Sequence, residues 1–339
     1  MQYRYIGKTG LRVTSICLGT MTFGSTTTKK EAFTILDMAY DRGINFYDTA
    51  ELYPVPPSSH YAGVTEEIVG EWLQTKPRES VILATKVAGA ASGWFVPPIR
   101  HGLTAIDRFH IKKAIEGSLK RLKTDYIDLY QMHWPDTVVP LQESLRAFEE
   151  LVKEGKVRYI GTSNDTAAGL TKATLIAKYE NLPRFESIQN NFSLLNPRFF
   201  DELENVCREH SISLLPYSPI AGGILSGKYN QVTPPQDARF ILYKNHKEKR
   251  VKNHAKKFYN EKTLQATQEF LEIATKYQLH PVTLAVAYSK HFEFVASTII
   301  GARKPDQLQA SLDAMELNLS REILKDITKL QQRYLYPMG

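Results

Sequence analysis

The sequence predicts an α/β fold of the (β/α)8 TIM-barrel type, and three observations support this prediction. Short apolar, β-branched runs alternate eight times with longer amphipathic segments, a rhythm typical of domains built on a parallel sheet. The runs are apolar at nearly every position, as expected for strands that are buried on both faces. The G-x-G-x-x-G string of a doubly wound dinucleotide-binding sheet occurs nowhere in the chain, which favours the closed barrel.

The eight predicted strands can be followed along the chain in order. The first four are ICLGT from Ile16, INFYDTA from Ile44, VILATK from Val81 and IDLYQMH from Ile127. The last four are VRYIGTS from Val157, SIQNN from Ser187, SLLPYS from Ser213 and STIIG from Ser297. A barrel of this length fits within one domain, so we expect residues 1–339 to form a single domain.

Amphipathic helices are predicted between these strands. Apolar residues recur at helical spacing in three segments, 32–39, 111–122 and 141–152. Gly43 follows the first segment and Gly155 follows the third, and glycine at these places is typical of a helix C-terminus.

Two segments depart from the alternating rhythm. The opening YRYIGKTGLRV predicts a hairpin that turns at Lys8-Thr9-Gly10 and covers the lower mouth of the barrel. The connection after the seventh strand, residues 219–279, is far longer than a normal βα link and begins rich in glycine and proline. Because long irregular loops usually carry function, we expect a long binding loop after strand 7.

Composition excludes several classes of protein. Hydrophobic residues make up 42% and charged residues 23%, as in globular domains, and no apolar run is long enough to span a membrane. The N-terminus lacks the layout of a secretory signal, and Cys17 and Cys207 are too few for a disulfide scaffold. We therefore expect a cytoplasmic protein with buried free thiols and no membrane partner.

The net charge of +7 owes much to the basic stretch from Lys244 to Lys257. No aromatic interleaving or nucleic-acid motif accompanies this stretch, so we interpret it as a solvated loop or helix face and expect no nucleic-acid partner. Its positive field would still attract a ligand that carries phosphate groups.

Polar residues end nearly every predicted strand. In a parallel barrel the C-terminal ends of the strands meet at one rim, where the chemistry takes place. The residues that converge there are Asp48, Lys86, His133, Ser163, Asn164, Gln189, Asn190, Tyr217, Ser218 and the segment Gly301-Ala302-Arg303, with Tyr53 shortly after the second strand.

Four of these residues together could carry out proton transfer: Asp48, Tyr53, Lys86 and His133. A tyrosine is a reluctant acid near neutral pH, but an ammonium group from Lys86 would lower the pKa of Tyr53, and Asp48 would hold that lysine in place. His133 would orient a substrate oxygen. No cluster with metal-ligand spacing and no G-x-S-x-G elbow appears, so we expect neither a metal site nor acyl-transfer chemistry.

Several segments then resemble the aldo-keto reductase superfamily. GINFYDTAELY looks like the signature that holds the catalytic Asp and Tyr, and ILATK and LYQMHWP look like its Lys and His segments. RYIGTSN, IQNNFSLL, PYSPIAGGILSGKY and IIGARKPDQL are similar to its cofactor-binding segments. The resemblance covers essentially the whole chain. AELYPVPP and YLYPMG further resemble the bacterial Tas-type NADP(H)-dependent branch, to which the β subunits of voltage-gated potassium channels are related.

The resemblance implies a role for each matching residue. Tyr53 would be the proton donor, supported by Asp48, Lys86 and His133. Ser163, Asn164 and Gln189 would hold the nicotinamide carboxamide, and Tyr217 would stack on its ring. Ser218, Pro219, Gly227, Lys228 and Arg239 would line the pyrophosphate, and Gly301, Arg303 and Gln307 would hold the adenosine end. Many relatives have Asn where this chain has Ser311. By position, Thr22, Phe23, Trp94 and Trp134 are candidate substrate contacts.

The resulting hypothesis is an oxidoreductase that reduces aldehyde or ketone carbonyls to alcohols with NADPH. The alternative is a cofactor-sensing regulatory subunit that resembles the potassium-channel β subunits. The predicted hairpin begins at about Tyr3, without the long N-terminal extension of some of those subunits, which favours the enzyme. A barrel hydrolase would leave the Ser-Asn, Gln and Tyr-Ser-Pro segments as coincidences. The sequence specifies neither the physiological carbonyl substrate nor the oligomeric state.

Overall fold

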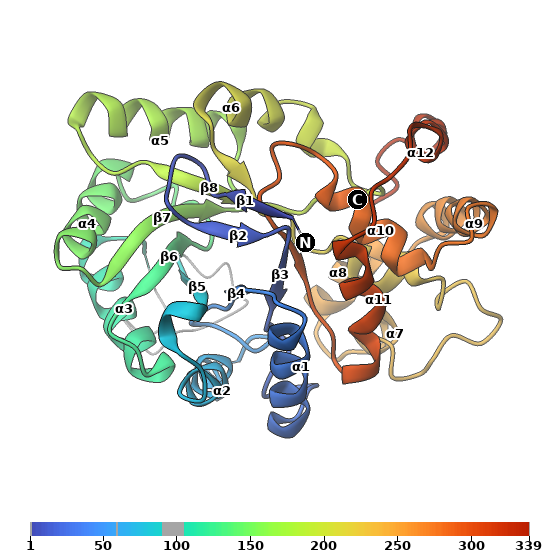
Figure 1. The fold of residues 1–339 in the computed structure, drawn as a ribbon, viewed down its shortest axis with the longest axis horizontal. Coiled ribbons are helices and arrows are strands. Elements are labelled where there is room, and N and C mark those ends of the chain that lie inside the picture. Colours follow the sequence, from blue (N-terminus) through green and yellow to red (C-terminus); the bar gives the residue numbers. More distant parts are fainter. Residues whose placement is uncertain (1, 59, 90–104, 339) are drawn as a thin grey trace.

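The protein folds around an eight-stranded parallel sheet in the computed structural model, which describes residues 2–58, 60–89 and 105–338 (Figure 1). The strands of the sheet are β3 (Ile16–Gly19), β4 (Phe46–Asp48), β5 (Ile82–Val87), β6 (Ile127–Met132), β7 (Val157–Ser163), β8 (Phe185–Gln189), β9 (Ser213–Leu214) and β10 (Thr298–Ile300). Their order is β10-β3-β4-β5-β6-β7-β8-β9, with parallel pairing throughout.

The two ends of this sheet are joined to each other. Leu214 forms a parallel bridge with Val295, just before β10, and the Ile299 N–H donates to the Pro216 carbonyl at 2.8 Å. The sheet therefore closes into a barrel, and all eight predicted strands are confirmed.

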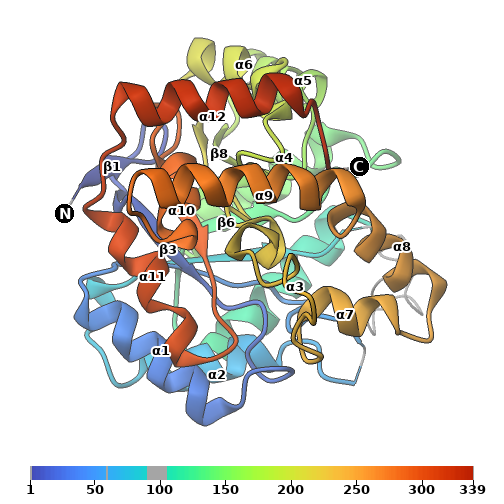
Figure 2. The ribbon, with the colours of Figure 1, turned by 90° about the vertical axis from the view of Figure 1, so that its right-hand side faces the viewer.

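Helices surround the barrel, mostly one after each strand (Figures 1 and 2). They are α1 (Lys29–Asp41), α2 (Val64–Leu73), α3 (Arg108–Leu122), α4 (Leu141–Lys153), α5 (Ala167–Glu180), α6 (Leu203–His210), α7 (Arg239–Lys244), α8 (Lys249–Phe258), α9 (Glu261–Lys276), α10 (Pro281–Lys290), α11 (Gln309–Leu312) and α12 (Arg321–Arg333). Short 3-10 turns are η1 (Arg78–Ser80), η3 (Arg198–Phe200), η4 (Ala221–Ser226), η5 (Pro305–Gln307) and η6 (Asp313–Met315).

Helix α1 shows how the sequence sets such an element. Thr28 caps its first turn, and Thr28 and Glu31 form a reciprocal capping box that satisfies free backbone N–H groups. Its predicted apolar face is buried against the barrel. Gly43 follows the helix with a φ of 81°, a left-handed conformation that favours glycine. The predicted helix and its terminator are confirmed.

The N-terminal hairpin closes one end of the barrel. Strands β1 (Tyr3–Tyr5) and β2 (Arg12–Thr14) pair antiparallel, and Figure 1 shows them lying across the barrel mouth. The apolar cluster beneath them joins hairpin residues Ile6, Leu11 and Val13 to the strand residues Cys17, Phe46, Ala84, Leu129 and Ile299 and to Leu215, which directly follows β9. The predicted plug is thus a continuous part of the barrel core.

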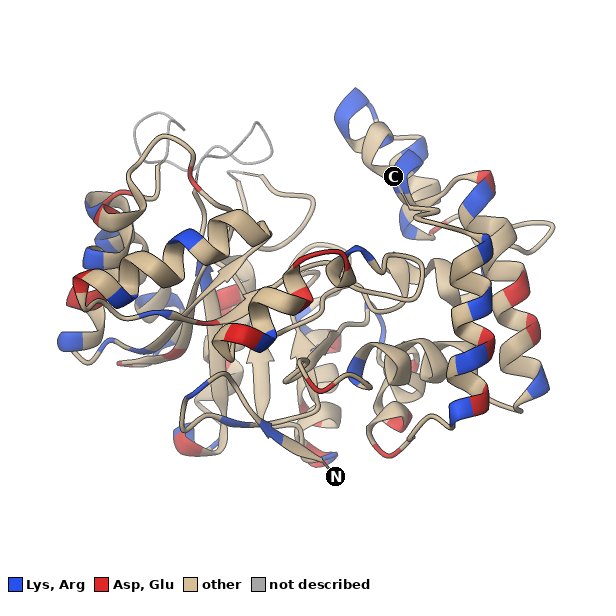
Figure 3. Cartoon of the chain, turned by 90° about the horizontal axis from the view of Figure 1, so that it is seen from above, with Lys and Arg blue, Asp and Glu red and all other residues tan. Residues whose placement is uncertain are grey.

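The connection between β9 and α10 is more ordered than the predicted irregular loop. It contains η4, α7, α8 and α9, and α7 and α8 lie at the end of the barrel opposite the hairpin (Figure 2). The basic stretch mostly forms α8. Figure 3 colours the Lys and Arg positions of the chain blue. Within the described ranges, no helix is long and apolar enough to cross a membrane.

A buried lysine at the end of α10 makes stability depend on pH. Lys290 is 2% exposed, and its Nζ donates to the Met315 carbonyl at 3.4 Å, a long hydrogen bond. Burial, helped by the charge of Arg4, lowers the pKa of Lys290 to about 8. An unfolded lysine keeps its proton to about pH 10.4. Between these two values the unfolded state binds more protons, so stability rises with pH across that window.

We therefore expect Lys290→Met to stabilise the fold by about 1–3 kcal/mol at neutral pH, because each unit of pKa shift is worth about 1.4 kcal/mol. The gain should shrink towards pH 10. Urea unfolding of both proteins at a series of pH values measures it. A variant that is less stable than the wild type at pH 7 would show that the Met315 bond outweighs the cost of burying the charge.

Candidate active site

The centre of the site is a buried ion pair between neighbouring strands. Asp48 is the last residue of β4, and Lys86 lies near the end of β5. The Lys86 Nζ lies 2.5 Å from Asp48 Oδ1 and donates to the Thr49 carbonyl at 2.8 Å. Burial alone would lower the pKa of Lys86, but Asp48 and then Tyr53 outweigh it and raise that pKa. Lys86 is therefore a fixed positive charge inside the barrel rim.

Two side-chain amides donate hydrogen bonds to the second carboxylate oxygen of Asp48. Gln131 Nε2 donates to Asp48 Oδ2 at 3.1 Å and Gln189 Nε2 donates to it at 2.9 Å. Gln189 was predicted from the sequence as a site residue, and Gln131 was missed. Gln131 lies on β6, two residues before His133, which directly follows the strand. Residues two apart along a strand share a face, so this spacing could have identified Gln131 from the sequence.

Tyr53 lies next to this pair and is 8% exposed. The Lys86 Nζ is 5.0 Å from the centroid of the Tyr53 ring. Burial raises the pKa of Tyr53 above its usual 10, although Lys86 acts in the opposite direction. The expectation of a lowered pKa was wrong for the net effect, because it took account of the neighbouring charge and not of the burial. Tyr53 therefore keeps its proton at neutral pH.

His133 forms the opposite wall. Its ring lies 5.7 Å from that of Tyr53, edge to face, and stacks on Trp134 at 4.0 Å. Burial, followed by the charge of Lys86, holds the pKa of His133 well below 6.5, so the imidazole is neutral. Its Nδ1 is buried and has no hydrogen-bond partner among the described residues. His133 offers a hydrogen bond and not a charge.

A polar chain extends from these residues along the rim. Ser163 Oγ donates to the Gln189 carbonyl at 2.8 Å. Asn164 Nδ2 donates to Ser163 Oγ at 3.1 Å and to the His133 carbonyl at 3.0 Å. Tyr217 Oη donates to Asn164 Oδ1 at 2.8 Å. The structure thus brings the four residues predicted around the nicotinamide into one hydrogen-bonded group next to Asp48 and His133.

Lys228, Arg239 and Arg303 are three cations that lie close enough to act on one another. Burial, then Arg303 and Arg239, lower the pKa of Lys228, and Asp237 opposes them. The side chain of Asp237 is 62% exposed and lies 3.3 Å from Arg303, which also donates to the Asp237 carbonyl at 2.8 Å. The positive charge here exceeds the nearby negative charge, an arrangement suited to a phosphate-bearing ligand.

The other predicted cofactor residues lie on the loops that follow β9 and β10. Ser218 (φ 57°), Pro219 and Gly227 (φ 78°) flank η4. Gly301 directly follows β10, and Gln307 Oε1 accepts from the Arg303 N–H at 3.2 Å. Gln307 belongs to η5, and the four-residue α11 follows it.

The predicted substrate contacts differ in their burial and in their neighbours. Phe23 is 0% exposed and packs in the main core, and its contact with a substrate stays a prediction. Thr22 is 8% exposed and bonds to Thr27 at 2.9 Å. Trp134 stacks on His133. Trp94 lies outside the described residues.

The apolar residues that pack around Tyr53 were not identified from the sequence. The cluster that contains Tyr53 also includes Ala50, Leu52 and Ala88, with Met21, Val55 and Trp134 packed against it. Met21 lies two residues after the end of β3, and Val55 lies in the loop that follows β4. The same strand-end rule that located Asp48 would have located them, because apolar loop residues at this rim surround the reacting groups.

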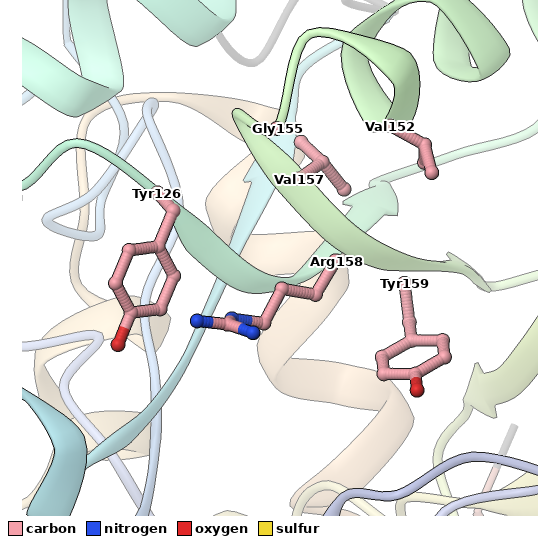
Figure 4. Close-up of a pocket in the computed structure, with 6 residues that line it drawn as sticks. All are labelled: Tyr126, Val152, Gly155, Val157, Arg158 and Tyr159. Atoms are coloured by element: carbon pink, nitrogen blue, oxygen red, sulfur yellow. The ribbon is translucent and has the colours of Figure 1, made fainter.

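Two hollows differ in their relation to the site. One of about 400 Å³ is lined by Tyr126, Val152, Gly155, Val157, Arg158 and Tyr159, with Arg158 extended towards Tyr126 (Figure 4). It lies where β6 and β7 begin, at the end of the barrel away from the polar rim. A second, of about 250 Å³, is lined in part by Asn164, Asn191, Arg198 and Tyr217 and adjoins the site.

Comparisons with known proteins agree with this architecture. The model of the Aldo/keto reductase family matches residues 15–332. The chain is 38% identical to Protein tas of Escherichia coli, covering 99% of both chains. It is 36% identical to the Uncharacterized oxidoreductase YrpG of Bacillus subtilis, covering 96% of this chain and 94% of that protein. It is 32% identical to a Probable voltage-gated potassium channel subunit beta of Arabidopsis thaliana, covering 94% and 92%.

The family match spans nearly the whole barrel, and the relatives align over almost their full lengths. The buried Asp48–Lys86 pair, with Tyr53 and His133 beside it, lies at the end of the barrel where (β/α)8 enzymes carry out their chemistry. The chain belongs to the aldo/keto reductase family.

Proposed function

We propose that the protein, acting as one domain in the cytoplasm, reduces an aldehyde or ketone to an alcohol with NADPH, and that Tyr53 donates the proton. One observation carries the proposal: a protonated tyrosine and a neutral histidine lie beside a buried ammonium group that is fixed by a carboxylate. The matches to a reductase family and to a relative named as an oxidoreductase support it.

The residues present fit a nicotinamide cofactor with phosphates. Ser163, Asn164 and Gln189 would hold its carboxamide, with Tyr217 against the ring. Ser218, Pro219, Gly227, Lys228 and Arg239 would line the pyrophosphate, and Gly301, Arg303 and Gln307 the adenosine end. The fit rests on the excess positive charge at Lys228, Arg239 and Arg303 and on the hydrogen-bonded group that joins Ser163, Asn164, Gln189 and Tyr217. When bound, the cofactor supplies the hydride.

The proton is the part of the reaction that the chain itself supplies. As a substrate oxygen gains negative charge, Tyr53 gives up its proton to it, and the Lys86 ammonium stabilises the phenolate left behind. Asp48 keeps Lys86 charged and is itself held by two amides. Neutral His133 orients the substrate oxygen by a hydrogen bond, and Trp134, Met21 and Val55 exclude water.

A panel of aldehydes and ketones tests the proposal. The purified protein should oxidise NADPH only when a carbonyl is present and should form the matching alcohol. The absence of turnover on every class of aldehyde and ketone, at full NADPH occupancy, would overturn it.

The similarity to a protein named as a potassium channel β subunit favours a second candidate, a subunit that binds NADP(H) to regulate a partner. Slow turnover combined with selective recovery of a membrane protein in a pull-down would favour this alternative. Fast turnover without such a partner would favour the enzyme.

Arg303 is expected to select NADPH over NADH, with Lys304 secondary. The 2′-phosphate would meet the Arg303 guanidinium, and a charge-assisted hydrogen bond is worth about 1.5–3 kcal/mol. Arg303→Ala should therefore reduce the preference by roughly 10- to 100-fold, through a higher KM for NADPH and an unchanged KM for NADH. Lys304→Ala should do the same to a smaller extent. If Arg303→Ala weakens the binding of NADPH and NADH equally, the arginine does not recognise the 2′-phosphate.

A further inference from the structure

The pairing between β4 and β5 continues past the end of β4 in an unusual way. The Thr49 N–H donates to the Ala84 carbonyl at 2.9 Å, and the Glu51 N–H donates to the Lys86 carbonyl at 3.2 Å. In a regular parallel ladder the next bond would join the Ala88 N–H to the Glu51 backbone carbonyl. The Glu51 side chain takes that N–H instead, through Oε1 at 2.5 Å. A carboxylate therefore forms the last rung of the ladder.

Ala88, which follows β5, is bonded through its carbonyl as well as through its N–H. His110 Nε2 lies 2.8 Å from the Ala88 carbonyl and 3.5 Å from Glu51 Oε1. Because a carbonyl only accepts, Nε2 carries the proton. His110 is 1% exposed and lies in the first turn of α3, where its own N–H is capped by Asp107 at 2.8 Å. Both backbone polar groups of Ala88 are thus bonded by side chains.

These bonds link the two segments that carry the proton chemistry. Glu51 lies between Asp48 and Tyr53, and Ala88 lies two residues after Lys86. The contact between Glu51 and Ala88 therefore fixes the Tyr53 loop relative to the strand that carries Lys86. The distance between the Lys86 ammonium and the Tyr53 ring depends on that placement.

Charged groups from several elements surround the carboxylate. Glu51 acts electrostatically on His110, on Glu66 of α2, on Arg121 of α3 and on Tyr130 of β6. Glu66 is itself fully buried and bound by Arg121 at 2.7 Å. Burial would lower the pKa of His110, but the bond to Glu51 leads the interactions that raise it. Glu51 is held in place by this packing and is only partly exposed.

We propose that Glu51 is a positioning residue: its carboxylate accepts the Ala88 N–H and so holds the Tyr53 loop against the end of β5. His110 supports this contact by donating to the Ala88 carbonyl. The proposal rests on the function proposed above, in which Tyr53 works beside Lys86. Glu51 touches neither substrate nor cofactor in this scheme.

Two substitutions separate the acceptor from the charge. Glu51→Ala removes both, whereas Glu51→Gln keeps an acceptor oxygen for the Ala88 N–H. Since a misplacement of about 1 Å near the reacting groups can cost about 100-fold in rate, we expect Glu51→Ala to lower kcat by about 10- to 100-fold with the KM for NADPH unchanged. Glu51→Gln should restore most of that loss. Glu67→Ala, which removes an exposed carboxylate on α2, is the matched control and should behave as the wild type.

The pH profile gives a readout that a general loss of stability would not move. Burial raises the pKa of Tyr53 and Lys86 lowers it, so a loop that moves changes both effects and should shift that pKa. Reduction needs the protonated tyrosine, so the alkaline limb of the pH–rate profile should shift in Glu51→Ala and stay in place in Glu51→Gln. An unmoved limb with wild-type kcat in Glu51→Ala, or an equal loss in both variants, overturns the proposal.

An exchange experiment keeps this inference separate from the proposed function. The Ala88 amide should exchange its hydrogen faster in Glu51→Ala than in the wild type, and Glu51→Gln should protect it. This measurement, together with the Tyr53 pKa followed by NMR of labelled tyrosine, needs no turnover. A wild-type protein that reduces no carbonyl would contradict the proposed function alone. Unchanged exchange and an unchanged Tyr53 pKa in Glu51→Ala would contradict the positioning role alone.

Discussion

Replacement of Tyr53 by Phe is expected to lower kcat for carbonyl reduction by about 100-fold or more, the usual scale for loss of a general acid. The substitution removes the hydroxyl and keeps the ring, which packs with Ala50, Leu52 and Ala88. NADPH binding should therefore survive. Steady-state kinetics with a carbonyl substrate, alongside titration of NADPH binding by fluorescence, measures the two effects separately.

Tyr61→Phe is the matched control for this experiment. Tyr61 lies in the same loop, and its hydroxyl donates to the Pro56 carbonyl at 2.8 Å, away from Lys86. Its removal should leave kcat close to the wild-type value. Near-normal kcat in Tyr53→Phe itself would remove Tyr53 from the mechanism.

The second large effect concerns the buried ion pair. Lys86→Met leaves the Asp48 carboxylate buried with two amide donors and no cation. Breaking a buried pair from one side typically costs 3–5 kcal/mol, and because the amides remain we expect a loss of about 3 kcal/mol in the free energy of unfolding. Activity should fall as in Tyr53→Phe, since no ammonium group stabilises the phenolate. Urea unfolding and kcat together measure these outcomes.

A double variant separates stability from catalysis. Asp48→Asn combined with Lys86→Met removes both charges, and replacing a whole buried pair is often neutral. We expect the double variant to regain most of the lost stability and to remain inactive. If Lys86→Met alone were as stable and as active as the wild type, the pair would have neither role.

The rim of the barrel was predictable because the fold imposes it. Once eight parallel strands are recognised, their C-terminal ends must converge, so Asp48, Lys86 and His133 follow from local strand patterns alone. Resemblance in motifs then attached roles to Ser163, Asn164 and Tyr217, which the structure joins by hydrogen bonds. The connection after β9 was predicted less well. Helix α8 buries only Val251 and Ala255, which is too little for a clear helical period.

The sequence by itself therefore determined the barrel, its hairpin plug and the residues gathered at one rim, because hydrophobic period and strand order are local properties. Tertiary structure alone decided how those residues interact. The bond from Gln189 to Asp48 joins residues 141 apart in the chain. The pKa of Tyr53 depends on how completely its neighbours bury it, and the burial of Phe23 depends on core packing. Burial and long-range contacts arise only when distant segments pack together, and no local pattern records them.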